Sequence, residues 1–193
     1  MSDISRVLLF IVSCVFTQNV VFTRLLIGRG LAENRRVGVA AGLGLAVTLV
    51  MTLASLCGWV VYNCLLVPMH AEYLKIIALV AVVLLAAWVV ELLLAKVCPA
   101  LAGALGEGFT AAAVSCAVLG IAIINIDQGY GLGYAVLGGL FGGLGYLLAL
   151  VLMAGVQDRL ETSRIPRCLK GLPISLISAS LIALAFMGFA GLA

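Results

Sequence analysis

Six long apolar stretches make up most of the chain, and short polar or charged segments separate them. Two of these stretches, residues 129–156 and 172–193, contain no charged residue. An α-helix of this length crosses a hydrocarbon core of ~30 Å and satisfies its own backbone hydrogen bonds, for which lipid offers no partner. The sequence therefore predicts an all-α integral membrane protein with almost no water-exposed domain.

The composition argues against a water-soluble globule, because 65% of the residues are hydrophobic and only 10% are charged. The length of 193 residues accommodates six crossings with short loops, so we expect a single membrane domain over residues 1–193. The first crossing contains Gln18 and Asn19 and lacks a small-residue cleavage site, which favours a retained helix over a signal peptide. The net charge of +3 comes from loop residues without a surrounding domain, so no nucleic-acid partner is expected.

The distribution of basic residues predicts how the chain is oriented. We place the crossings at residues 7–23, 37–62, 76–94, 101–126, 129–156 and 172–191. Nine Lys and Arg residues lie in the loops after the first, third and fifth crossings, whereas only Arg6 and Lys75 lie on the other side. Because positively charged loops stay in the cytoplasm, we expect both termini outside.

The second and fifth crossings echo each other. Residues 42–51 read Gly-Leu-Gly-Leu-Ala-Val-Thr-Leu-Val-Met, and residues 143–152 read Gly-Leu-Gly-Tyr-Leu-Leu-Ala-Leu-Val-Leu. Each follows a short crossing that small or polar residues interrupt. Two repeats of three helices each, roughly residues 1–98 and 99–193, would have opposite orientations and would bring functional groups together near the bilayer midplane. The alternative is that Gly and Leu recur by chance in an apolar chain.

Glycines crowd the fifth crossing, where Gly138, Gly139, Gly142 and Gly143 form overlapping Gly-x-x-x-Gly pairs. Without side chains, two helix backbones approach closely and gain dispersion contacts that lipid would not supply. This pattern predicts helix packing, either within the bundle or against a partner subunit.

The cysteines do not form a recognisable zinc or thioredoxin-like motif. None of the six, Cys14, Cys57, Cys64, Cys98, Cys116 and Cys168, belongs to a Cys-x-x-Cys pair. Five of them are best interpreted as small buried hydrophobic residues. Cys116 differs, because it lies deep in the fourth crossing among small residues, where a thiolate could ligate iron.

Polar residues inside the predicted crossings are the next candidates for function. Asn19 and Asn125 need hydrogen-bond partners, and an ionised carboxylate at a helix centre costs ~2.5–3.5 kcal/mol on insertion scales. Glu91 and Glu107 both lie near the cytoplasmic ends of their crossings. Each is therefore either an interfacial carboxylate or a ligand on an ion path. Asn19, Asn125 and Glu107 are the candidate ion-path or polar midplane residues.

Four parts of the chain resemble a known family. They are residues 44–48 with 52–55, residues 66–68 with 72–74, Cys-Ala-Val-Leu-Gly at 116–120, and Leu-Ala-Phe-Met-Gly-Phe-Ala-Gly-Leu at 184–192. They resemble the A subunit of the Rnf-type ion-translocating electron-transport complex and its relative, the E subunit of the sodium-pumping NADH:quinone reductase. The resemblance covers essentially the whole chain. It implies a six-helix inverted repeat in the bacterial inner membrane that pairs with a homologous subunit of opposite topology and with other members of the complex.

The resemblance also implies a cofactor, a [2Fe–2S] cluster at the midplane to which each of the paired subunits gives two cysteines. The second family cysteine matches Cys116. The first, in a Gly-Leu-Cys-Pro motif, aligns without a gap to Gly28, and Arg29 stands where the family has proline. Since glycine has no side chain, a four-cysteine cluster cannot be built with this subunit.

Three accounts follow from this departure at Gly28. The cluster persists with a substitute ligand, the complex has lost the cluster, or the fold has been redeployed as a small transporter or scaffold. The resemblance implies a membrane subunit of an Rnf-like ferredoxin:NAD⁺ oxidoreductase. This subunit is inactive alone and contributes to transmembrane electron transfer coupled to Na⁺ or H⁺ translocation.

Overall fold

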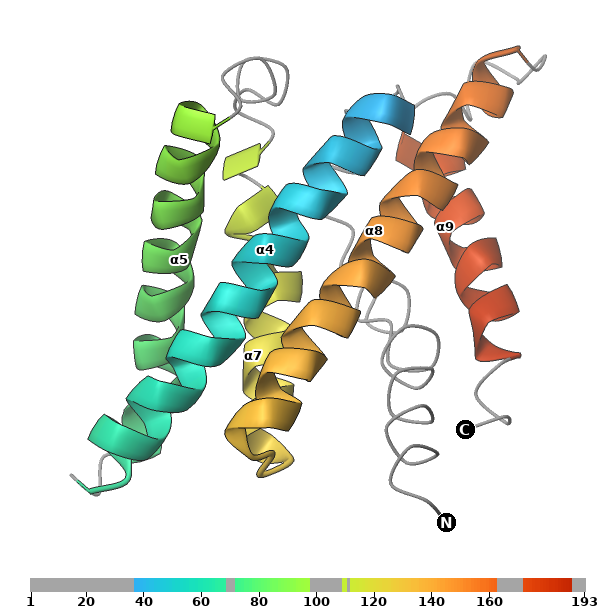
Figure 1. The fold of residues 1–193 in the computed structure, drawn as a ribbon. Coiled ribbons are helices and arrows are strands. Elements are labelled where there is room, and N and C mark those ends of the chain that lie inside the picture. The colour runs from blue at the N-terminus through green and yellow to red at the C-terminus, as the bar shows by residue number, and fades with distance from the viewer. Residues whose placement is uncertain (1–36, 69–71, 98–108, 111, 163–171, 189–193) are drawn as a thin grey trace, which may run out of the picture.

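The computed structural model describes residues 37–68, 72–97, 109–110, 112–162 and 172–188, and within these ranges it is entirely helical apart from short turns. The helices are α4 Val37–Val61, α5 Lys75–Val97, α7 Cys116–Asp127, α8 Leu132–Thr162 and α9 Leu172–Met187 (Figure 1). A π-helical turn, Tyr62–Leu66, extends α4, and a 3₁₀ turn, Glu72–Leu74, precedes α5. The predicted all-α fold is therefore confirmed for the described residues.

Three of these helices are long and apolar enough to cross a membrane. Their apolar segments are Ala40–Leu66, Lys75–Lys96 and Leu132–Leu160, and α7 and α9 are shorter apolar helices. The bounds of α4 and α5 agree with the second and third predicted crossings. The first predicted crossing, residues 7–23, lies outside the described residues.

Helix α8 continues past the predicted end of its crossing at Val156. Its final residues, Gln157-Asp-Arg-Leu-Glu-Thr162, are polar except for Leu160, and they contain neither Gly nor Pro. Hydropathy marks where a lipid-facing stretch ends, whereas a helix ends only where its backbone is interrupted. The last turns of α8 therefore extend beyond the predicted end of the crossing.

The turn between α7 and α8 explains where α7 ends. Gly129 has a φ of 63°, a conformation that glycine adopts without strain. The N–H of Tyr130 donates to the carbonyl of Asn125, and the N–H of Gly129 donates to the carbonyl of Ile126. This pair of bonds is a Schellman motif, which satisfies carbonyls that a helix end otherwise leaves open.

An antiparallel pair, α4 and α8, forms the centre of the bundle (Figure 1). Helix α5 packs against α4, α9 packs against α8, and α7 contacts α4, α5 and α8. The shared core consists of buried apolar side chains from all five helices, among them Leu43, Val50, Val83, Val118, Tyr146, Leu150 and Ala179. In Figure 1, α7 lies behind α4, so the two central helices cover it from one side.

The two overlapping glycine pairs in α8 face different neighbours. A Cβ on Gly139 or Gly143 would meet Ser55 or Thr48 of α4 at less than 3 Å. A Cβ on Gly138 or Gly142 would instead collide with Asn125 or Ile121 of α7. One helix thus allows two others to approach its backbone closely, so the packing prediction is confirmed within the bundle itself.

A set of polar contacts joins the helices at one end of the bundle. The Trp59 indole N–H donates to the carbonyl of Tyr130 at 2.9 Å. Lys75, the first residue of α5, forms an ion pair with Asp127, the last residue of α7. These contacts place the segment after α4, the start of α5 and the α7–α8 turn at the same end.

The ion pair between Lys75 and Asp127 should contribute little to stability. Both side chains are partly exposed, with relative accessibilities of 26% and 52%. Exposed ion pairs are typically worth ~0–1 kcal/mol, because water screens the charges. We expect Lys75→Gln to lower the free energy of unfolding by less than ~1 kcal/mol. A thermal melt in detergent would measure this, and a loss several times larger would show that the pair is effectively buried.

Candidate functional site

The fourth predicted crossing is interrupted in its middle, directly before Cys116. Helical residues end at Ala113, Val114 and Ser115 form a turn and bend, and α7 begins at Cys116. Ser115 has an extended conformation, with φ −74° and ψ 154°, and serves as the N-cap residue of α7. The expected interruption of this crossing is therefore a break in the helix, and Cys116 is the first residue of the helix that follows the break.

The start of α7 provides a local environment that favours a negative charge. The Ser115 carbonyl already accepts hydrogen bonds from the N–H groups of Val118 and Leu119. The Ser115 hydroxyl caps no N–H, and its buried oxygen has no hydrogen-bond partner among the described residues. A helix N-terminus carries a partial positive charge, so the start of α7 attracts negatively charged groups nearby.

Cys116 lies near the middle of the fourth predicted crossing, residues 101–126. Its side chain is exposed on the surface of the isolated chain. The thiol is therefore accessible to a contact from outside this chain.

Asn125, near the other end of α7, is buried and holds three helices together. Its amide nitrogen donates to the Ser55 hydroxyl of α4 and to the Ala135 carbonyl of α8, each at 3.1 Å. Both amide hydrogens are thus used within the protein, and Oδ1 lies against Gly138. Any contact with an ion would have to use this oxygen.

The family follows from the extent of the sequence match. Residues 7–193 match the family described as "Rnf-Nqr subunit, membrane protein". The chain belongs to the Rnf-Nqr family. It is 42% identical over 188 residues to the A subunit of the ion-translocating oxidoreductase complex of Syntrophotalea carbinolica, with 97% of each chain covered.

Other members of the Rnf-Nqr family show the same similarity over nearly the full length. The chain is 41% identical to the A subunit of the Na⁺-translocating ferredoxin:NAD⁺ oxidoreductase complex of Acetobacterium woodii, over 96% of this chain and 97% of that protein. It is 38% identical to the A subunit of the ion-translocating oxidoreductase complex of Cereibacter sphaeroides, with 95% of each chain covered. The resemblance that the sequence indicated is therefore confirmed.

The structure describes only two of the predicted site residues of this Rnf-Nqr family member, and it does not bring these two together. Cys116 and Asn125 lie on α7, at its first residue and in its last turn. Gly28, Asn19 and Glu107 lie outside the described residues. Glu91 is exposed in the second half of α5, as an interfacial carboxylate would be.

The sequence did not predict the hydrogen-bond partner of Asn125 on α4. Ser55 is distant in sequence from Asn125, and no local pattern links the two residues. Ser115 did carry a usable signal, because a serine directly before an apolar run is a typical helix start.

Within the described residues, no three His, Cys, Asp or Glu side chains gather as a metal site would require. Cys116 is therefore not part of a metal site that the described residues form by themselves.

We expect Asn125→Ala to destabilise the protein by ~1–2 kcal/mol. The substitution removes two interhelical hydrogen bonds, and measured values for such bonds in membranes average ~0.6 kcal/mol. It also leaves the buried Ser55 hydroxyl without its donor. Asn63→Ala is the matched control, since exposed Asn63 donates only to the Trp59 carbonyl one turn earlier. Equal melting temperatures for the two variants would contradict this role of Asn125.

Proposed function

We propose that the protein is a membrane subunit of an Rnf-like, ion-translocating ferredoxin:NAD⁺ oxidoreductase. Its task is to contribute to transmembrane electron transfer coupled to Na⁺ or H⁺ movement. The observation that carries this proposal is the similarity to the Acetobacterium woodii protein over nearly the whole of both chains. The match covers nearly all of both proteins. A function of the Acetobacterium woodii protein would therefore not require a domain that this chain lacks.

The described helices suit a role inside the membrane better than catalysis at its surface. Ferredoxin and NAD⁺ are water-soluble electron carriers, and their redox reactions require water-accessible binding sites. Each of the three long described helices contains an 18-residue stretch of high mean hydropathy with at most two charged residues. We therefore assign ferredoxin oxidation and NAD⁺ reduction to other subunits of the complex. We assign the transfer of electrons through the bilayer to this subunit.

We propose that the chain crosses the bacterial inner membrane six times as an inverted repeat of three helices each, with both termini outside. The packing of the described helices supports this arrangement. Helix α5 flanks α4, and α9 flanks α8, as expected if the two halves of the chain correspond. Lys96 and Arg159, in the last turns of α5 and α8, support the orientation, because Lys75 is at the opposite end of α5.

Cys116 is the residue that we assign to an iron–sulfur centre. Its thiol is exposed, and the residue begins α7, a half-helix whose N-terminus favours negative charge. Bound there, an iron–sulfur centre would supply one-electron transfer in a dry environment. This chain would supply only the Cys116 thiolate as a ligand, since Gly28 cannot provide a second thiolate. The other ligands would come from a homologous partner of opposite topology.

A second candidate is a divergent subunit that has lost the cluster and serves the complex as a structural or ion-path element. Gly28 and Arg29 favour this alternative, because they replace the cysteine and proline of the family motif. Iron bound by the Gly28→Cys variant, but not by the native complex, would support it.

The proposed function is tested in membrane vesicles from cells with and without this protein. We expect ferredoxin-dependent NAD⁺ reduction, and the accompanying uptake of Na⁺ or H⁺, to be lost without it and restored by the intact gene. Varying the Na⁺ concentration identifies the coupling ion. Full activity in vesicles that lack the protein would overturn the proposal.

A further inference from the structure

The polar contacts that join α7 to the two central helices lie at the end farthest from Cys116. In the last turn of α7, the Asn125 amide nitrogen donates to Ser55 Oγ of α4 and to the Ala135 carbonyl of α8, each at 3.1 Å. In the first turn, the N–H groups that form hydrogen bonds donate to the carbonyl of Ser115, directly before the helix. Among the described residues, hydrogen bonds therefore tie α7 to α4 and α8 at Asn125 and not at Cys116.

Close contact with α8 fixes the same half of α7. A Cβ on Gly138 would collide with Asn125 Oδ1, and a Cβ on Gly142 would collide with the Ile121 side chain. Residues four apart lie on the same face of a helix. One face of α7, which includes Ile121 and Asn125, is therefore seated directly on the glycines of α8.

The break before α7 makes these contacts decisive for the position of Cys116. Val114 and Ser115 interrupt the crossing, so the preceding helical residues do not determine where α7 lies. Apolar packing is non-directional, whereas hydrogen bonds to two neighbouring helices fix both the rotation and the height of α7. About 14 Å of continuous helix joins Asn125 to Cys116, so a displacement at one end is transmitted to the other.

We propose that Asn125 is a positioning residue for Cys116. By holding α7 against α4 and α8, its amide fixes the position of the thiol at the other end of the helix. This role rests on the proposed function, in which Cys116 is a ligand of an iron–sulfur centre. The ligands of a metal centre must be held within about 0.5 Å of their productive positions, which depends on residues outside the ligand set.

The distance between two spin labels tests this positioning without any iron. The full-length chain, with the other four cysteines replaced by serine, is labelled at the exposed thiols of Cys57 on α4 and Cys116 on α7 and placed in lipid nanodiscs. We expect one narrow distance distribution, which Asn125→Ala shifts or broadens. Ala179→Gly is the control for loss of stability, because Ala179 is buried on α9, which packs against α8. It should lower the melting temperature and keep the narrow distribution.

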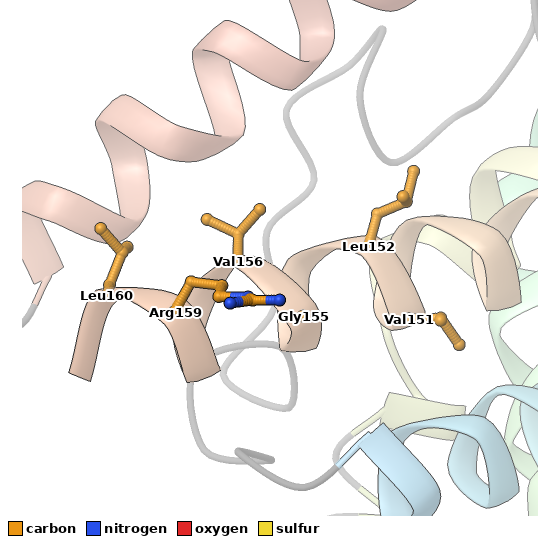
Figure 2. A pocket seen from close by; sticks show the side chains of 6 residues that line it. All are labelled: Val151, Leu152, Gly155, Val156, Arg159 and Leu160. Carbon is orange, nitrogen blue, oxygen red and sulfur yellow. The ribbon is translucent and has the colours of Figure 1, made fainter. Parts of the chain in front are cut away.

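Gly138→Ala tests the same contact without removing a hydrogen-bonding group. Its Cβ would displace the Asn125 amide, so we expect a shift or broadening like that of Asn125→Ala. Gly155→Ala is the matched control on the same helix. Gly155 lines an open groove near the end of α8 (Figure 2), and a Cβ there meets no atom within 4 Å. This control should keep the narrow distribution.

The assembled complex tests the consequence for the iron–sulfur centre. In the presence of an iron chelator, the EPR signal of the Asn125→Ala complex should decay about tenfold faster than the native signal, the smaller effect that outer-shell residues have on metal affinity. The Ala179→Gly complex should lose its signal at the native rate.

The two measurements separate this role from the proposed function. An unchanged label distance in Asn125→Ala, an equal change in Ala179→Gly, or a native decay rate of the Asn125→Ala signal would overturn the positioning role. A changed label distance, together with a native complex that holds no iron–sulfur centre, would support the positioning of Cys116 and overturn its assignment as a ligand.

Discussion

Replacing Gly143 with leucine is expected to prevent this protein from folding stably in the membrane. Any Cβ at this position would lie 2.7 Å from Thr48 Cγ2 and 2.8 Å from Thr48 Cα. The Thr48 side chain could adopt another rotamer, but Thr48 Cα belongs to the backbone of α4 and cannot move by itself. The two central helices, α4 and α8, would therefore have to separate. Overpacking of this kind typically costs ~1–3 kcal/mol, and a residue as large as leucine should reach or exceed the upper value.

The matched control is Gly133→Leu, also on α8. Gly133 is exposed, and a Cβ there meets no atom within 4 Å. Its replacement should leave stability unchanged or raise it slightly, because glycine is a poor helix former. Melting temperature and the amount of protein in membranes are the measurements. Equal melting temperatures and equal amounts in membranes for the two variants would show that stability does not require the close approach of α4 and α8 at Gly143.

Cys116→Ser is expected to abolish most of the electron transfer without affecting assembly. The thiol is exposed in the isolated chain, so its replacement disturbs no packing within it. Electron transfer should fall by at least about tenfold, because even outer-shell partners of a metal centre are worth ~10–100-fold. Ferredoxin-dependent NAD⁺ reduction by the purified complex measures the loss.

Cys57→Ser provides the control for this experiment. Cys57 is also exposed, so its predicted burial was wrong, and it lies within the continuous helix α4 and not at a helix break. Its substitution should leave the rate unchanged. If Cys116→Ser retained the native rate in a complex of native composition, Cys116 would have no part in the electron route.

Hydropathy and residue spacing predicted much of this fold. The bounds of α4 and α5 could be read from apolar length, because a crossing helix must match the thickness of the membrane. The glycine pairs in α8 predicted close packing because small residues are what such packing requires. The sequence could not predict that one pair faces α4 and the other faces α7, since this depends on the rotation of α8 about its own axis.

The candidate site was predictable only where a single residue stood out. Cys116 was notable for its small neighbours, and Ser115 carried the signal of a helix start. The bond from Asn125 to Ser55 joins residues on separate helices, so no local pattern indicates it. The polar end of α8 was missed for a different reason, because hydropathy reports contact with lipid and not the continuity of a helix.

The most direct test of the account is the iron content and EPR spectrum of the complex, purified anaerobically through a tag on this protein. After reduction, the native complex should show an iron–sulfur signal that Cys116→Ser removes or shifts, with a matching fall in iron. The Cys57→Ser complex should keep the native signal. An identical spectrum and iron content in the Cys116→Ser complex would contradict the assignment of Cys116 as a ligand.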